Sequence, residues 1–150
     1  MRFESEESGQ MVLDVWLELP KHYPHVVLDA FVVMPNHVHG IIGLTEQQVG
    51  AGLRPAPTMG RRHGLPEIVR AFKSFSARRV NAYLETSGPL WQRGYYEHVI
   101  RDEASLSRIR EYILNNPLRW AYDRDNPLGK PDGDEQIFWE AVGQNLSKNL

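Results

Sequence analysis

The chain has 150 residues, 41% of them hydrophobic, which is enough for a single domain with a substantial core. It contains no cysteine, which excludes disulfides, thiolate metal sites and a cysteine nucleophile. Its formal net charge of −2 excludes a uniformly basic surface for nucleic acid. No apolar stretch is long enough to span a membrane and the acidic start does not resemble a signal peptide, so we expect a soluble, cytoplasmic domain.

The first part of the chain predicts a helix followed by a β-hairpin. Apolar residues recur at helical spacing over about residues 10–19, and Pro20 ends the pattern. Residues 25–34 and 38–44 are rich in β-branched and aromatic residues and flank a turn-forming Pro-Asn pair. We therefore expect two neighbouring strands joined by a tight turn.

A loop, a second helix and a third strand are predicted next. Residues 45–64 are rich in glycine and proline and have little apolar content, which indicates a flexible loop. Pro66 suits the first turn of a helix, and an apolar face then runs as far as Tyr83. Residues 90–100 are rich in aromatic and apolar side chains and are predicted to form a strand, with a bend or bulge at Gly94.

The last elements are a helix that carries a tyrosine and a polar tail. Asp102 begins this third helix and Pro117 closes it. Residues 123–150 are predicted to be a polar, weakly ordered tail with a short helix over 137–142. We expect one domain over 1–150, with its core at about 10–122.

The order of these elements predicts an α+β fold, namely a ferredoxin-like split-βαβ sandwich with an added C-terminal helix. The opening strand of that fold is missing from the pattern. Residues 1–9 are too few and too acidic to supply a central strand, so the strand that follows the turn is expected to lack one hydrogen-bonding neighbour.

The charge is unevenly distributed along the chain. Between Arg61 and Arg101 there are 8 basic and 3 acidic residues, a net charge of +5, interleaved with aromatic residues. Guanidinium groups for phosphates and flat rings for stacking suit single-stranded nucleic acid, whereas the alternative is a solvated helix face with aromatic core residues. The residues of this segment predicted to contact nucleic acid are Arg70, Lys73, Arg78, Arg79, Trp91, Arg93 and Tyr95.

Two histidines, His37 and His39, stand at the start of the predicted second strand of the hairpin. Side chains alternate between the faces of a strand, so both imidazoles lie on one face and can bind one metal ion. A pair of this kind also occurs by chance in a chain with 6 histidines, but here a rigid turn precedes it and an apolar strand follows it.

Tyr112 and Asn116 are four residues apart on the predicted third helix, and so on one face of it. A phenol has a pKa of about 10 and needs a nearby cation to act as a nucleophile or to polarise its target. The alternative is that Tyr112 is a boundary aromatic and Asn116 only ends the helix. Because Asn116 precedes a proline, Asn115 is a rival for its place.

Four segments together resemble a known family. MPNHVHGII, FKSFSARR, LWQRGYYEHVIRD and REYILNNP occur in the order and spacing of the HUH single-tyrosine transposases, especially the REP-associated tyrosine transposases of bacteria. The resemblance extends from about Trp16 to Trp120. Members of that family begin with a strand before the first helix, and this chain begins after it.

The resemblance implies a function and a set of site residues. His37, His39 and Asn116 would bind Mg²⁺ or Mn²⁺, and Tyr112 would attack a phosphate of single-stranded or hairpin DNA. The product would be a 5′-phosphotyrosine and a free 3′-hydroxyl, and a second 3′-hydroxyl could later reverse the step and join DNA.

Two other functions fit the sequence. One is a truncated, inactive remnant that binds hairpin DNA without cutting it, which the missing strand favours. The other is a small zinc hydrolase that uses His37, His39 and His98 with an activated water, although no acidic general base stands at motif spacing. Without the first strand, we also expect low stability or pairing with a second copy as a homodimer.

Overall fold

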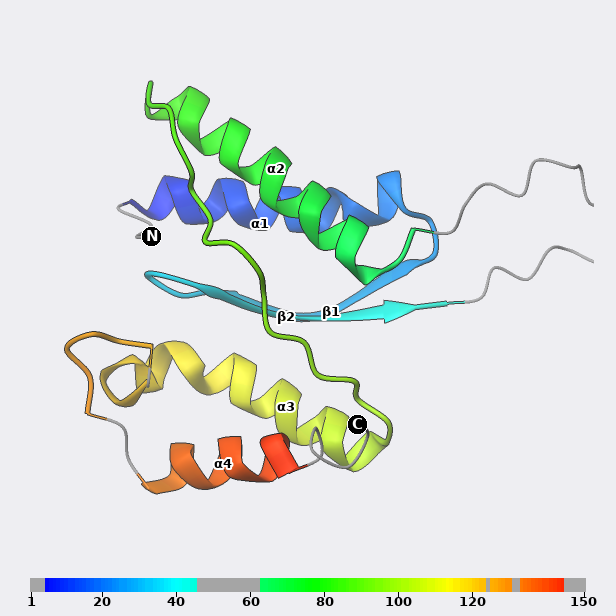
Figure 1. Cartoon of the computed structure of the whole chain (residues 1–150), viewed down its shortest axis with the longest axis vertical. Helices are drawn as coiled ribbons and strands as arrows, with labels where there is room; N and C mark the ends of the chain where they lie inside the picture. The colour runs from blue at the N-terminus through cyan, green and yellow to red at the C-terminus, as the bar shows by residue number, and fades with distance from the viewer. Residues whose placement is uncertain (1–4, 46–62, 124, 131–132, 145–150) are drawn as a thin grey trace, which may run out of the picture. The chain divides into compact units, whose positions relative to one another are not determined.

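The computed structural model describes residues 5–45, 63–123, 125–130 and 133–144 (Figure 1). The chain divides into two compact units. The helix-pair unit consists of Ser5–Asp29 and Ile42–Trp91, and the site unit contains Ala30–Ile41 and the chain from Gln92 onward. No helix among the described residues is long and apolar enough to cross a membrane.

The predicted hairpin is confirmed. Strands β1 (Val26–Val33) and β2 (Val38–Leu44) form a two-stranded antiparallel sheet. The backbone N–H of Met34 donates to the carbonyl of His37 at 2.8 Å and closes the turn between them. The tip of the hairpin, which carries the two histidines, belongs to the site unit.

Helix α1 (Glu6–His22) is longer than predicted at both ends. At its start, the Ser5 side chain accepts a hydrogen bond from the backbone N–H of Ser8, and acidic residues occupy the first turn, where the helix dipole favours them. At its end, the helix continues through Pro20 to His22, and the backbone N–H of Tyr23 still donates to the Leu19 carbonyl, so the predicted end at Pro20 is wrong.

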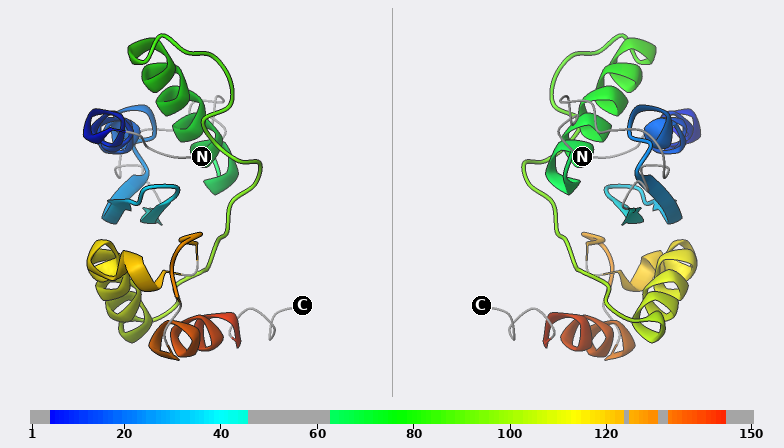
Figure 2. Two further views of the ribbon diagram at one scale, coloured as in Figure 1. Left: turned by 90° about the vertical axis from the view of Figure 1, so that its left-hand side faces the viewer. Right: turned by 90° about the vertical axis from the view of Figure 1, so that its right-hand side faces the viewer.

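Helix α2 (Leu65–Tyr83) begins as predicted, with Pro66 in its first turn, and packs on α1 (Figures 1 and 2). The rings of Trp16 and Phe72 meet edge to face with centroids 5.9 Å apart. The hydrophobic residues that are buried along these two helices are Val12, Val15, Trp16, Leu19, Ile68, Phe72 and Val80. These residues form the core of the helix-pair unit.

The prediction of a strand at residues 90–100 is wrong. The structure has no strand there, and the sheet of the described residues has two strands. Gly94 adopts a φ of +75°, in the left-handed region, which interrupts an extended backbone. A strand also requires a neighbour to pair its backbone groups, and side-chain pattern alone does not supply one. The helices and the two-stranded sheet confirm the α+β class. The ferredoxin-like sandwich stays a prediction.

The third predicted helix is present as α3 (Glu103–Asn115), with Asp102 as its N-cap. A 3-10 helix, η1 (Asn116–Tyr122), continues from it, with Pro117 in its first turn. Helix α4 (Gly133–Gln144) lies in the segment expected to be a polar tail and is longer than the predicted short helix. Most of the predicted loop, residues 46–62, lies outside the described residues.

Candidate metal centre

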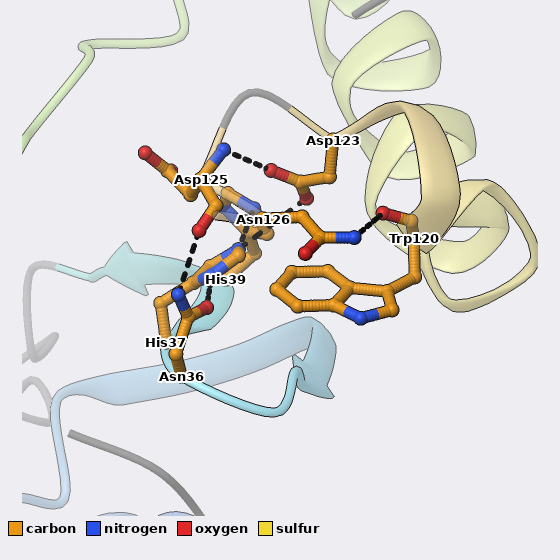
Figure 3. A network of polar contacts seen from close by, with 7 residues as sticks. All are labelled: Asn36, His37, His39, Trp120, Asp123, Asp125 and Asn126. Carbon is orange, nitrogen blue, oxygen red and sulfur yellow. Dashed lines mark hydrogen bonds and ion pairs between the residues drawn. The ribbon is translucent and has the colours of Figure 1, made fainter. Parts of the chain in front are cut away.

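The two histidines predicted as ligands meet at the start of β2, in the site unit. Nε2 of His37 lies 2.9 Å from Nε2 of His39, and their ring planes are at 82° (Figure 3). Both side chains are partly buried. The alternation of side chains along a strand thus brings the two nitrogens together as predicted.

Asn36, in the turn before β2, fixes the orientation of His37. The Asn36 side-chain amide donates to the backbone carbonyl of Asp125 at 2.6 Å, which leaves its Oδ1 as the acceptor. This Oδ1 lies 2.7 Å from Nδ1 of His37, so Nδ1 carries the hydrogen and donates it. The lone pair of His37 is then on Nε2, the nitrogen that faces His39.

Asp123, which follows η1, lies with the two histidines and was not among the metal ligands predicted from the sequence. Its side chain is 1% exposed, and its Oδ1 accepts a hydrogen bond from the backbone N–H of Asp125 at 2.7 Å. Its Oδ2 is buried with no hydrogen-bond partner and lies 3.7 Å from Nε2 of His37. One ligand atom each from His37, His39 and Asp123 lies within 4.8 Å of the others, an arrangement that could hold a metal ion.

The backbone around Asp123 is fixed by a tight turn. The backbone N–H of Asn126 donates to the Asp123 carbonyl at 3.0 Å, and its side-chain amide donates to the carbonyl of Trp120 at 2.9 Å. The Trp120 ring lies 6.0 Å from the ring of His37 (Figure 3). The turn that carries the Asp123 carboxylate is therefore bonded to Trp120, whose ring lies beside His37.

Tyr112, the predicted nucleophile, lies next to this group. It is partly buried on α3, and its ring centroid is 5.7 Å from that of His39, at an interplanar angle of 76°. Its ring also stacks on Phe138 of α4, with centroids 4.1 Å apart and planes at 6°. Two aromatic contacts thus hold the phenol beside the histidine pair.

Two other residues considered as metal ligands, Asn116 and His98, each have a buried side-chain nitrogen without a hydrogen-bond partner. Asn116 is 3% exposed, and its side-chain Nδ2 has no hydrogen-bond partner among the described residues. Its role as a ligand stays a prediction. His98 also has a buried Nδ1 without a hydrogen-bond partner, but the group of described residues that could hold a metal ion contains Asp123 and not His98.

Several of the predicted DNA-binding residues make contacts within the helix-pair unit. Arg79 forms a bidentate ion pair with Glu18 of α1, with N–O distances of 3.3 and 2.9 Å. The indole N–H of Trp91 donates to the buried hydroxyl of Ser76 at 2.9 Å. These contacts stabilise the unit, and they fit the alternative of a structural role for both residues.

Of the other predicted DNA-binding residues, four are exposed and Lys73 is partly buried. Arg70 and Arg93 are exposed, and the Arg78 guanidinium lies 5.9 Å from the centroid of the Phe75 ring. The pKa of Lys73 is lowered by desolvation. The Tyr95 hydroxyl donates to Glu97 at 3.3 Å, and its pKa is raised, first by desolvation and then by the charge of that carboxylate.

The fold and the site together define an α+β protein with a His-His-Asp group beside a tyrosine. The chain is 39% identical over 132 residues to an "Uncharacterized protein" of Haemophilus influenzae, an alignment that covers 82% of this chain and 72% of that protein. The chain belongs to the same family as this protein. No protein-family model matches the chain, and no solved structure does.

A second relative carries a functional description. The chain is 32% identical over 104 residues to a "Putative REP-associated tyrosine transposase" of Haemophilus influenzae. The alignment covers 68% of this chain and 54% of that protein, so the chain spans about half the length of this relative. The likeness agrees with the resemblance of the sequence motifs.

Proposed function

We propose that the protein cleaves and rejoins single-stranded DNA through a covalent 5′-phosphotyrosine at Tyr112. Mg²⁺ or Mn²⁺ would be held by His37 and His39, whose Nε2 atoms lie 2.9 Å apart. The observation that carries the proposal is the position of the Tyr112 ring against His39. The likeness to a protein described as a transposase supports it further.

The chemistry requires a nucleophile and a means of stabilising charge on the phosphate. The phenol oxygen of Tyr112 forms a bond to phosphorus, the bond from phosphorus to the 3′-oxygen breaks, and the proton lost by the phenol is balanced by one gained at the 3′-hydroxyl. A divalent cation supplies Lewis acidity at the scissile phosphate. The aromatic contacts of Tyr112 with His39 and Phe138 restrict the ring, so less freedom is lost when it aligns for attack.

Rejoining follows from the covalent link. The phosphotyrosine keeps the energy of the phosphodiester bond, so a 3′-hydroxyl of another strand can displace Tyr112 without ATP. DNA is held through cations and rings of the basic segment. Arg70, Arg78 and Arg93 are exposed and are the first choice for phosphate contacts, whereas Arg79, also exposed, is paired with Glu18.

The proposal is tested with labelled single-stranded and hairpin oligonucleotides, Mn²⁺ and denaturing electrophoresis. We expect a labelled product that stays attached to the protein and disappears in Tyr112→Phe. The matched control is Tyr83→Phe, which removes the same hydroxyl from a side chain 51% exposed at the end of α2 and should retain the product.

Other outcomes would overturn the proposal in defined ways. Cleavage that persists in Tyr112→Phe, without a covalent product, would indicate a hydrolase that uses water. Binding of hairpin DNA with no cleavage across the oligonucleotide set would indicate a binding protein.

A further inference from the structure

We propose that the carboxylate of Asp123 is the third protein ligand of the divalent cation, which makes the site a His-His-carboxylate centre. The inference rests on the proposed function only for the presence of a cation at the two histidines. The family resemblance predicts Asn116 in this place, so the structure assigns the role to a residue seven positions further along the chain.

The first argument is the burial of an incompletely satisfied carboxylate. Asp123 is 1% exposed, and only its Oδ1 has a hydrogen-bond donor, the backbone N–H of Asp125. Its Oδ2 has no hydrogen-bond partner. Burying a charged oxygen without a partner is costly, and buried carboxylates are usually paired or bind metals. A cation beside Oδ2 removes this cost.

The second argument is the spacing of the donor atoms. Ligand distances of about 2.1 Å place neighbouring donors of an octahedral cation about 3 Å apart. The two Nε2 atoms of the histidines are 2.9 Å apart, and Oδ2 of Asp123 is 3.7 Å from the Nε2 of His37. All three ligand atoms lie within 4.8 Å of one another, so they can bind one ion once the carboxylate moves toward the histidine pair.

The third argument is a chain of hydrogen bonds that connects His37 to Asp123 and orients both side chains. Asn36 binds Nδ1 of His37 through its oxygen and the carbonyl of Asp125 through its amide (Figure 3). The N–H of the same Asp125 holds Oδ1 of Asp123. Residues that orient ligands in this way contribute strongly to metal affinity.

The chemistry of the donors also favours Asp123. A carboxylate adds a negative charge and a hard oxygen, which suits Mg²⁺ and Mn²⁺ better than two neutral imidazoles alone. Asn116 could offer only a neutral carbonyl oxygen.

The test is calorimetric titration of the full chain with Mn²⁺, together with thermal melting with and without Mn²⁺. Asp123→Asn should weaken Mn²⁺ binding at least tenfold and abolish the rise in melting temperature that Mn²⁺ causes. Without metal, this variant should melt no lower than wild type, because the amide oxygen can still accept from Asp125 and the unpaired buried charge is gone. Asn116→Ala should bind Mn²⁺ within about threefold of wild type.

The matched control is Asp134→Asn, which removes the same charge from an exposed side chain at the start of α4. It should bind Mn²⁺ like wild type. The inference is overturned if Asp123→Asn binds Mn²⁺ normally, if Asn116→Ala loses binding instead, or if wild type does not bind Mn²⁺. Because metal binding is measured without DNA, a loss of cleavage alone, as in Tyr112→Phe, would bear only on the proposed function.

Discussion

Removing the side chain of Asn36 should weaken metal binding without touching a ligand. Asn36→Ala deletes the acceptor for Nδ1 of His37, at 2.7 Å, and the donor to the Asp125 carbonyl, at 2.6 Å. Two hydrogen bonds at about 1 kcal/mol each predict a loss of about 2 kcal/mol in unfolding free energy. Because His37 also loses the contact that fixes its tautomer, Mn²⁺ affinity should fall by about 10-fold to 100-fold.

The assay combines Mn²⁺ titration by calorimetry with urea unfolding of the metal-free protein. Asn81→Ala is the matched control, since Asn81 also donates one side-chain hydrogen bond, to the Gly88 carbonyl at 2.9 Å, and accepts one, from the Thr86 hydroxyl at 3.2 Å. It belongs to the helix-pair unit and should lose stability without losing Mn²⁺ affinity.

A second variant separates the two roles of Asn36. Asn36→Asp keeps an acceptor for His37 but turns a carboxylate oxygen toward the Asp125 carbonyl, so it should lose stability yet bind Mn²⁺ more tightly than Asn36→Ala. The reasoning is refuted if Asn36→Ala binds Mn²⁺ with the affinity of wild type, or if Asn81→Ala weakens binding equally.

Two further predictions concern the helices. Ser76→Ala should lower the unfolding free energy by about 1–3 kcal/mol in urea titrations, because the indole N–H of Trp91 loses its acceptor, while Ser74→Ala in the same helix should have little effect. Asp102→Ala should lower the melting temperature at neutral pH, since Asp102 caps α3 through the backbone N–H of Ser105. That hydrogen bond lowers the pKa of Asp102, so the stabilisation is present above the usual carboxylate range and lost as pH falls through the lowered pKa. The difference between wild type and Asp102→Ala should therefore disappear in acid, and a difference that persists there would contradict this account.

The elements that could be predicted from the sequence are those whose signals are local. The hairpin and the helices follow from side-chain period, and the pairing of His37 with His39 follows from strand geometry alone. The position of Tyr112 beside His39 did not follow from period, and motif resemblance was needed to connect the helix with the strand.

Asp123 could not be found by the same reasoning. It lies in a segment rich in turn-forming residues, which indicates a turn but not that its first side chain points inward. An aspartate that accepts a hydrogen bond from the backbone two residues later is a common turn feature, so it does not identify a metal ligand. The predicted strand at residues 90–100 failed for a related reason, because pairing depends on a neighbour that local composition does not specify.

The contact between the two imidazoles has a consequence for the chemistry of metal uptake. At 2.9 Å, one of the two Nε2 atoms must carry a hydrogen that the other accepts. His37 already donates from Nδ1 to Asn36, so in the neutral pair the shared hydrogen belongs to His39. For Nε2 of His39 to bind a metal ion, the neutral ring must carry its hydrogen on Nδ1 instead. The nitrogen chemical shifts of Nδ1 and Nε2 of His39, compared without and with metal, should report this change.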